Sequence, residues 1–347
     1  MSLVATIDVS QFIRNIQTIR KRTRTNIIAV VKADAYGHGA AALSQYGQNY
    51  VEEFAVADIR EALELQRSGI VKPINILSPV ESLESFKDLT NIVPTLCSLR
   101  DINTLKRQKN KPLRVNVEIN TGMNRLGIAY NEVPCMQERL HAAGLQLKSV
   151  FSHLYNAADY EAAKKQRAIF ESATQQLPKE VKRHIAASAC MHLPENFFLD
   201  AVRPGIGLYG YALDTQPIVT IHASILKIFN VAKGETISYG SYIAPRNMLV
   251  AAVRAGYADG IRRKSDPEAE NRFMQVGDVL CPIVGQVCMD ITMIDVTQAR
   301  VNYAQPVYVL SSRLRAEALA DAELTNVYEV LTSFKGRVER RYTQLPS

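Results

Sequence analysis

The stretch IIAVVKADAYGHG, at residues 27–39, sets the pattern for the first two thirds of this chain. Five apolar residues have the length and composition of a buried strand, and the run ends abruptly at Lys32. The residues that follow include Tyr36 and two glycines, which is typical of a loop that approaches another group closely. A lysine at such a strand end faces either solvent or a site, and position alone does not distinguish the two.

Seven more short apolar runs follow, at residues 53–57, 74–78, 92–96, 113–119, 147–152, 184–188 and 199–202. Segments with helical periodicity lie between them, the clearest at 58–68 and 159–176. Asp58 is a plausible N-cap and Gly69 a plausible helix stop. The segments after the first and seventh runs have the weakest helical pattern. Strands alternating with helices predict a (β/α)8 TIM-type barrel, with a doubly wound open sheet as the alternative.

The pattern changes after about residue 215, where β-branched runs are punctuated by glycine. The runs SILKIFNV (224–231), MLVAAVRA (248–255) and DVLCPIVGQVCMDITMIDVT (278–297) are typical of strands. We therefore expect an α/β barrel over residues 10–216, followed by a mostly-β domain over residues 217–347.

Composition excludes several classes of protein. No apolar run reaches the ~18 residues of a membrane span, and the N-terminus lacks the features of a signal peptide. The five cysteines are dispersed and form no CxxC pair, so we expect free thiols, a cytoplasmic location and no metal site. The net charge of +7 is interleaved with acidic residues, so we expect a solvated surface rather than a nucleic-acid partner.

The active site of a TIM barrel forms at the carboxyl ends of its strands. Five places in the sequence meet that description: Lys32, residues 120–125, His153, Ser188 and residues 203–207. A lysine amine in a partly dry pocket has a lowered pKa and can form a Schiff base. Ser188 and the backbone N–H groups near Gly205 fall where such barrels often bind phosphate. The letters GIGLYG at 205–210 fit a dinucleotide fingerprint poorly, because they do not open a first βαβ unit.

The chain resembles the alanine racemase family across nearly its whole length. The matching stretches, in the family's order and spacing, are AVVKADAYGHGA, NTGMNRLG, SHLYNAAD, ASACM, VRPGIGLYGY, SYGSYI, GYADGIRR, VGQVCMDITMIDVT and NVYEVLTSF. The resemblance implies a barrel that binds pyridoxal 5′-phosphate (PLP) and a C-terminal β-domain that the N-terminal strand, within residues 1–9, joins. It also implies a homodimer in which the partner chain completes each active site.

The resemblance implies a reaction with two bases. PLP supplies the electron sink for removal of the α-proton. Lys32 holds the PLP and is one base, and Tyr257 of the partner subunit is the other. A phenol has an ordinary pKa of about 10, so it needs cationic or hydrogen-bonding neighbours, which the family places at positions matching His153 and Arg203. Arg203 also faces the pyridine nitrogen and leaves the ring uncharged, which limits side reactions of the carbanion.

The resemblance assigns the remaining positions to the cofactor, the substrate or their support. Phosphate-binding residues are Tyr36, Ser188, Gly205, Ile206 and Tyr328. Arg125, near the cofactor's phenolic oxygen, and the Met289 N–H hold the substrate carboxylate beside Tyr257. Tyr239 and Asp290 support the partner-side wall. The expected substrate is alanine, and the expected product is D-alanine for cell-wall peptidoglycan.

One position departs from the family pattern. Many members carry a lysine seven residues before the Arg125 equivalent, and CO₂ converts that lysine to a carbamate that pairs with the arginine. Here the position is Glu118, and Asn120 stands where aspartate is common. We hypothesise that the Glu118 carboxylate replaces the carbamate, with a looser contact or an ion between the two groups.

Three alternatives are open at this point. A racemase of another small amino acid such as serine would share the same residues. A PLP-dependent decarboxylase of basic amino acids has the same architecture but usually places a carboxylate at the pyridine nitrogen, which Arg203 argues against. A PLP-homeostasis barrel without turnover would lack residues 217–347, and with them Tyr257 and Met289.

Overall fold

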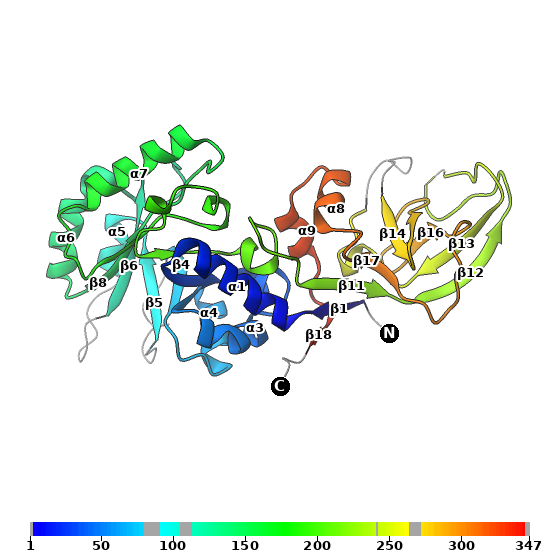
Figure 1. Ribbon diagram of the computed structural model, residues 1–347, viewed down its shortest axis with the longest axis horizontal. Coiled ribbons are helices and arrows are strands. Elements are labelled where there is room, and N and C mark those ends of the chain that lie inside the picture. Colours follow the sequence, from blue (N-terminus) through cyan, green and yellow to red (C-terminus); the bar gives the residue numbers. More distant parts are fainter. Residues whose placement is uncertain (1–2, 80–90, 105–112, 241, 264–271, 344–347) are drawn as a thin grey trace. The chain divides into compact units, whose positions relative to one another are not determined.

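The computed structural model describes residues 3–79, 91–104, 113–240, 242–263 and 272–343. The chain divides into two compact units, which Figure 1 colours along the sequence. One consists of Gln11–Ala35 and Gly39–Gln216, and the other of Met1–Ser10, Tyr36–His38 and Pro217–Ser347.

The larger unit is a nearly closed barrel of eight parallel strands. In spatial order they are β10 (Ala201–Val202), β2 (Asn26–Val30), β3 (Glu53–Val56), β4 (Ile74–Pro79), β5 (Ile92–Leu96), β6 (Arg114–Asn120), β8 (Gln146–Phe151) and β9 (Lys182–His184). A short strand β7 (Ile128–Ala129) adds to β6. A parallel bridge between Ala187 and Arg203 joins the two ends of the order. All eight strands predicted from the apolar runs are present, so the predicted barrel is confirmed.

Helices cover the outside of the barrel strands (Figure 1). They are α1 (Val9–Thr23), α3 (Ala40–Gly47), α4 (Ile59–Arg67), α5 (Leu99–Thr104), α6 (Val133–Ala142) and α7 (Tyr160–Thr174). As predicted, the Asp58 side chain caps α4, accepting from the N–H groups of Arg60 and Glu61. Between β9 and β10 the chain forms only the short 3-10 turns η4 (Ser188–Cys190) and η5 (Glu195–Phe197), which accounts for the weak helical pattern there.

The second unit is mostly β. Its larger sheet has the order β15 (Val279–Pro282), β14 (Phe273–Val276), β17 (Val307–Leu310), β11 (Val219–Ala223), β1 (Val4–Ile7) and β18 (Glu339–Tyr342). Strand β1 runs antiparallel to β11 and parallel to β18, so the beginning and the end of the described chain lie side by side in this sheet. A second sheet has the order β12 (Ile225–Val231), β13 (Met248–Val253) and β16 (Thr292–Asp295).

A separate apolar core holds the second sheet in place, formed by Val231, Ile237, Ala244, Met248, Val250 and Val284. The same unit contains the helices α8 (Ala316–Ala322) and α9 (Val327–Ser333), so it is mostly β rather than purely β, as predicted. Among the described residues of both units, no helix has the length and apolar character that crossing a membrane requires.

Candidate active site

A left-handed turn follows Lys32 directly. The element α2 (Lys32–Tyr36) contains three residues in succession near φ 52–54° and ψ 48–49°, beginning at Ala33. Such a run is unfavourable for residues with a Cβ, so neighbours must hold it in place. The Glu61 carboxylate does so, accepting from the N–H of Ala33 at 2.7 Å and of Ala57 at 2.7 Å. Lys32 is thereby anchored at the end of β2 instead of continuing into an ordinary helix.

The environment of Lys32 favours the neutral amine. Burial lowers the pKa of Lys32 below its ordinary value, and the positive charge of Arg125 lowers the pKa further. The Glu61 carboxylate acts in the opposite direction and is the weakest of the three influences. A neutral amine is the form that can act as a nucleophile or accept a proton.

Arg203, at the end of β10, is buried at 4% exposure and held on two edges of its guanidinium. Nη1 donates to Nδ1 of His184 at 2.5 Å and to the His184 carbonyl at 3.0 Å. Nη2 donates to the Ser152 carbonyl at 2.6 Å and, at 3.5 Å, to that of Ile185. The guanidinium also lies 4.8 Å from the ring centroid of Phe151. Among the described residues its Nε–H has no acceptor.

Three predicted residues lie within electrostatic reach of Arg203. Burial and the charges of Arg203, Arg125 and Lys32 lower the pKa of His153 to about 3, so this imidazole is neutral at physiological pH. Glu118 is 5% exposed, and burial raises the pKa of its carboxyl group, although Arg203 and Arg125 act to lower it. In the described structure no ion pair within 4 Å joins Glu118 to Arg125, and the Glu118 side chain accepts from the Cys97 thiol at 3.6 Å. Arg125 itself is exposed.

Ser188 organises the chain at the end of the barrel's seventh and eighth strands. Its hydroxyl oxygen accepts from the N–H of Gly205 at 2.9 Å and of Gly207 at 3.0 Å, which leaves its O–H as a donor. A Cβ on Gly207 would come within 2.9 Å of Ala212 Cβ and 3.2 Å of Ser188 Oγ, so this approach requires glycine. Ile206 begins the 3-10 turn η6 (Ile206–Tyr209) directly after Gly205.

In the β-domain unit, two loops bring Tyr257 and Met289 together. Tyr257 begins the 3-10 turn η7 (Tyr257–Asp259), and its N–H donates to the Cys288 carbonyl at 3.0 Å. The N–H of Ala258 donates to the Met289 carbonyl at 3.0 Å. Gly256 permits this contact, since a Cβ there would lie 2.2 Å from the Met289 oxygen. Met289 is 50% exposed and Tyr257 39%.

Four other predicted residues lie in the same unit. Tyr36 is buried, and its ring lies 5.9 Å from that of Tyr328. Burial, and then Tyr328, raise the pKa of the Tyr36 phenol above its ordinary value. Tyr239 is exposed, and its backbone pairs with that of Gln286. Asp290 forms an exposed ion pair with Arg337.

Sequence reasoning missed two residues that hold these groups, Glu61 and His184. Both occupy places where a signal exists: Glu61 stands in the first turn of an amphipathic helix, and His184 opens a predicted buried strand. A polar side chain on a buried strand needs a hydrogen-bond partner, and that requirement could have drawn attention to His184.

These features define a class of protein: a parallel barrel followed by a mostly-β domain. A half-buried lysine stands at the end of one barrel strand, β2, and a buried, hydrogen-bonded arginine stands at the end of the neighbouring strand, β10. Comparison with family models gives the particular family. The alanine racemase N-terminal domain matches residues 7–213, and the alanine racemase C-terminal domain matches residues 218–342. The chain belongs to the alanine racemase family.

Individual relatives agree over nearly the whole chain. An alanine racemase of Thermodesulfovibrio yellowstonii is 35% identical over 359 residues, covering 98% of this chain and 97% of the relative. An alanine racemase of Pasteurella multocida is 33% identical over 350 residues, covering 94% of this chain and 95% of the relative. The solved alanine racemase of Bartonella henselae with covalently bound pyridoxal phosphate aligns with a TM-score of 0.89 at 29% identity, covering 99% of this chain and 100% of that chain. The predicted family, fold class and kind of enzyme are thereby confirmed, whereas the roles of individual residues stay predictions.

Proposed function

We propose that this chain interconverts L- and D-alanine with PLP held on Lys32, using Lys32 and Tyr257 of the partner subunit as opposed bases. The observation that carries the proposal is that two particular side chains occur together in the barrel. The pKa of the Lys32 amine is lowered, and the buried Arg203 has no acceptor for its Nε–H among the described residues. Both sit at strand ends of a barrel whose family is that of alanine racemases.

The donor set of the barrel fits PLP. The Ser188 O–H and the turn at Gly205–Ile206 suit the phosphate. The family resemblance assigns the phenols of Tyr36 and Tyr328, which belong to the other unit, to the same group. The acceptor-free Nε–H of Arg203 suits the pyridine nitrogen, which is an acceptor when unprotonated. When bound, PLP supplies an electron sink that acidifies the α-proton of the amino acid.

Lys32 moves the proton on one face of the substrate. Its amine accepts the α-proton in one direction and returns a proton in the other, and its lowered pKa favours the neutral form that accepts. Arg203 stays cationic, since burial lowers its pKa only to about 10, and so it donates to the ring nitrogen without protonating it. To His153, which is neutral at physiological pH, we assign the role of a hydrogen-bonding neighbour of the Tyr257 phenol that adds no charge.

Tyr257 moves the proton on the other face, from the partner subunit. The exposure of Tyr257 and of Met289, and the hydrogen bonds that tie their two loops together, support a role toward a second chain. Arg125 and the Met289 N–H would hold the substrate carboxylate, with Tyr239 and Asp290 supporting that wall. We further propose a cytoplasmic homodimer whose product, D-alanine, serves peptidoglycan synthesis.

Serine is the nearest competing substrate, because its side chain is only one hydroxyl larger than that of alanine. A decarboxylase is disfavoured because Arg203, rather than a carboxylate, stands at the position proposed for the pyridine nitrogen. The deciding experiment incubates PLP-loaded protein with L-alanine, L-serine and L-lysine, and measures the D-enantiomer and CO₂. D-alanine should dominate; CO₂ without D-alanine would overturn the proposal.

Lys32→Ala tests the covalent attachment, with the exposed Lys164→Ala as matched control. We expect Lys32→Ala to lose at least about 10³-fold in rate, because it lacks both the nucleophile and one base. After borohydride reduction and denaturation, the wild type should keep its PLP covalently attached, whereas Lys32→Ala should release it. Dilution tests the partner's contribution. Below the dimer dissociation constant, racemisation should fall while bound PLP persists, and a constant specific activity for a demonstrated monomer would contradict the shared site.

A further inference from the structure

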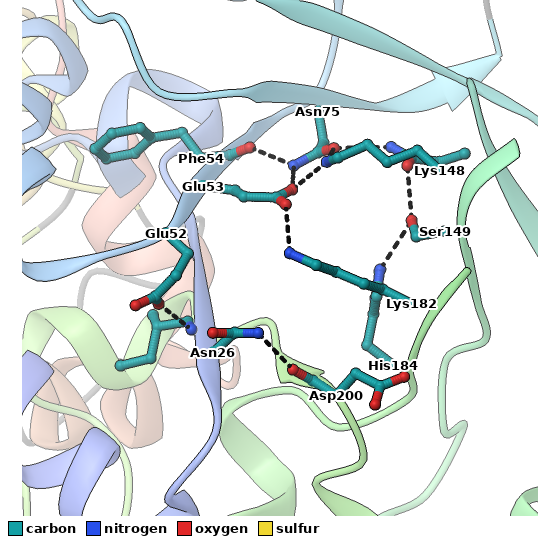
Figure 2. Close-up of polar contacts among 12 residues, drawn as sticks. Asn26, Glu52, Glu53, Phe54, Asn75, Lys148, Ser149, Lys182, His184 and Asp200 are labelled. Atoms are coloured by element: carbon teal, nitrogen blue, oxygen red, sulfur yellow. Dashed lines mark hydrogen bonds and ion pairs between the residues drawn. The ribbon is translucent and has the colours of Figure 1, made fainter. Parts of the chain in front are cut away.

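A line of hydrogen bonds crosses the barrel interior from Arg203 to Glu53, through side chains that are all buried. Figure 2 shows its course from His184 through Ser149 to Asn75 and Glu53. The successive distances are 2.5 Å from Arg203 to His184, 3.2 Å to Ser149, 2.6 Å to Asn116, 2.8 Å to Asn75 and 2.9 Å to Glu53. Five barrel strands contribute five of these side chains, and Arg203 follows the end of a sixth strand, β10.

The chemistry of the two ends fixes the direction of every bond in this line. A guanidinium only donates, so Nδ1 of His184 must accept, and its proton must lie on Nε2. Nε2–H then donates to the Ser149 hydroxyl, which in turn donates onward. At the far end an ionised carboxylate only accepts, so the amide of Asn75 must present its NH₂ to Glu53.

A line of donors that all point the same way stabilises both of its charged ends. Each group turns its negative end toward Arg203 and its positive end toward Glu53. Two lysines reinforce the anionic end: Lys148, which pairs with Glu53 and donates to Asn75 at 2.9 Å, and Lys182, at 3.3 Å from Glu53. These charges favour an ionised Glu53, since the lysines lower the pKa of its carboxyl group against the effect of burial.

We propose that His184 is a positioning residue, held by this line of hydrogen bonds as the Nε2–H tautomer so that its Nδ1 fixes the guanidinium of Arg203. With Nη1 bound to His184 and Nη2 bound to the Ser152 carbonyl, Nε–H is left for a ligand acceptor. The role toward PLP rests on the proposed function, because it takes the pyridine nitrogen as that acceptor.

A neutral imidazole suits this task better than a charged partner would. A carboxylate against Arg203 would neutralise the guanidinium, whereas imidazole holds it in place and leaves its charge for the ligand. His184 stays neutral because it is buried and faces only cations among the charged groups that act on it: Arg203, Lys148 and Lys182. Its ring also stacks on Phe151, with centroids 5.3 Å apart, which fixes the ring plane.

The tautomer can be measured independently of any racemase activity. Full-length protein labelled with ¹⁵N in histidine gives imidazole signals, and the one lost in His184→Asn belongs to His184. We expect an unprotonated Nδ1, a protonated Nε2 and no titration over about pH 5–8, where an ordinary histidine changes charge. A protonated Nδ1, or titration in that range, overturns the proposal. A racemase assay that failed would instead overturn the proposed function and leave this measurement standing.

Two variants separate positioning from a structural role. His184→Asn keeps an acceptor near the place of Nδ1, whereas His184→Leu removes it. We expect His184→Leu to bind PLP at least about tenfold more weakly, the loss of one hydrogen bond to a charged group, with a shifted visible spectrum of the bound PLP. His184→Asn should recover most of that affinity and the wild-type spectrum, and the exposed His192→Leu should change neither. Equal losses in both His184 variants, following thermal stability alone, would overturn the positioning role.

Discussion

The barrel and the β-domain hold their candidate site residues in opposite ways. In the barrel, Arg203 and Ser188 are buried, and several backbone and side-chain partners fix each of them. In the β-domain, Tyr257, Met289 and Tyr239 are largely exposed, and backbone hydrogen bonds fix their loops while the side chains reach the surface. The first arrangement suits the cofactor site that we propose, and the second suits groups that contact something outside the unit.

The difference indicates a division of labour. A cofactor site must be rigid before the ligand arrives, since flexibility there weakens both binding and catalysis. Residues that act on a neighbouring chain need a rigid backbone and an accessible side chain, which is how Tyr257 is held. If so, changes in the barrel should alter PLP binding, whereas changes around Tyr257 should lower turnover and leave PLP binding unchanged.

Tyr257→Phe is expected to give the largest effect. Loss of one proton-transfer group should lower the rate of racemisation by about 10²–10⁴-fold while PLP binding stays unchanged. The remaining base on Lys32 should still exchange the α-proton of one alanine enantiomer with solvent deuterium. Chiral chromatography with mass spectrometry measures both outcomes. The exposed Tyr303→Phe in the same unit is the control, and equal exchange of both enantiomers in Tyr257→Phe would remove Tyr257 from the mechanism.

Glu53→Gln should have the next largest effect, on stability. Glu53 is buried and pairs with the buried Lys148 and the partly exposed Lys182, so removing its charge leaves the buried Lys148 cation unpaired, at a cost of about 3–5 kcal/mol in the free energy of unfolding. The β-domain pair of Arg313 with Asp278 is exposed, and Asp278→Asn should cost less than about 1 kcal/mol. Urea unfolding measures both; similar losses would show that burial does not set the difference.

The strands of the barrel were predictable because a buried parallel strand needs an apolar run whatever its neighbours are. The turn after Lys32 was not, because its left-handed backbone depends on Glu61, a residue in a different βα unit. The line of hydrogen bonds through His184 was equally hidden. Its members are single polar residues in six separate strands or strand ends, and only the register of the strands brings them together.

Recognition of the family supplied what local pattern could not. Periodicity placed Lys32 at a strand end but left it indistinguishable from a surface lysine. The resemblance named Tyr257, about 225 residues away, and the structure adds that the Tyr257 and Met289 loops are hydrogen-bonded to each other. What Glu118 does in place of a lysine could not come from either source, because this position departs from the pattern on which the resemblance rests.

Gly256→Ala tests the difference between the barrel and the β-domain with a backbone change. A Cβ there would overlap the Met289 carbonyl, so the two loops must separate, at a cost of about 1–3 kcal/mol. Turnover should fall while PLP affinity, measured by spectral titration, is retained. Gly207→Ala is the barrel counterpart, since its Cβ would press on Ala212 and Ser188, and it should weaken PLP binding. If both variants lost PLP equally, the division between the two regions would be wrong.

Glu118→Gln tests the barrel residue that departs from the family, and its effect should be the smallest. If the Glu118 charge helps to hold Arg125, Glu118→Gln should raise KM for alanine by about tenfold or less, the value of one weak charge interaction. Unchanged kinetics together with an unchanged Arg125 position would refute the replacement of the carbamate. The exposed Glu180→Gln is the control.

The same variant has a stability signature whose sign follows from the pKa of Glu118. Burial raises that pKa above its unfolded value of about 4.3, so the folded protein binds the carboxyl proton more tightly than the unfolded chain does. The stability that this proton provides is fully present below the unfolded pKa and is lost as pH rises through the folded pKa. Glutamine stays neutral throughout, so Glu118→Gln should match the wild type in acid and become the more stable protein as pH rises. Urea unfolding over that pH range measures the difference. A variant that is less stable than the wild type at neutral pH would contradict this sign, because it would show that the attraction of Arg203 and Arg125 for the Glu118 carboxylate exceeds the cost of burying its charge.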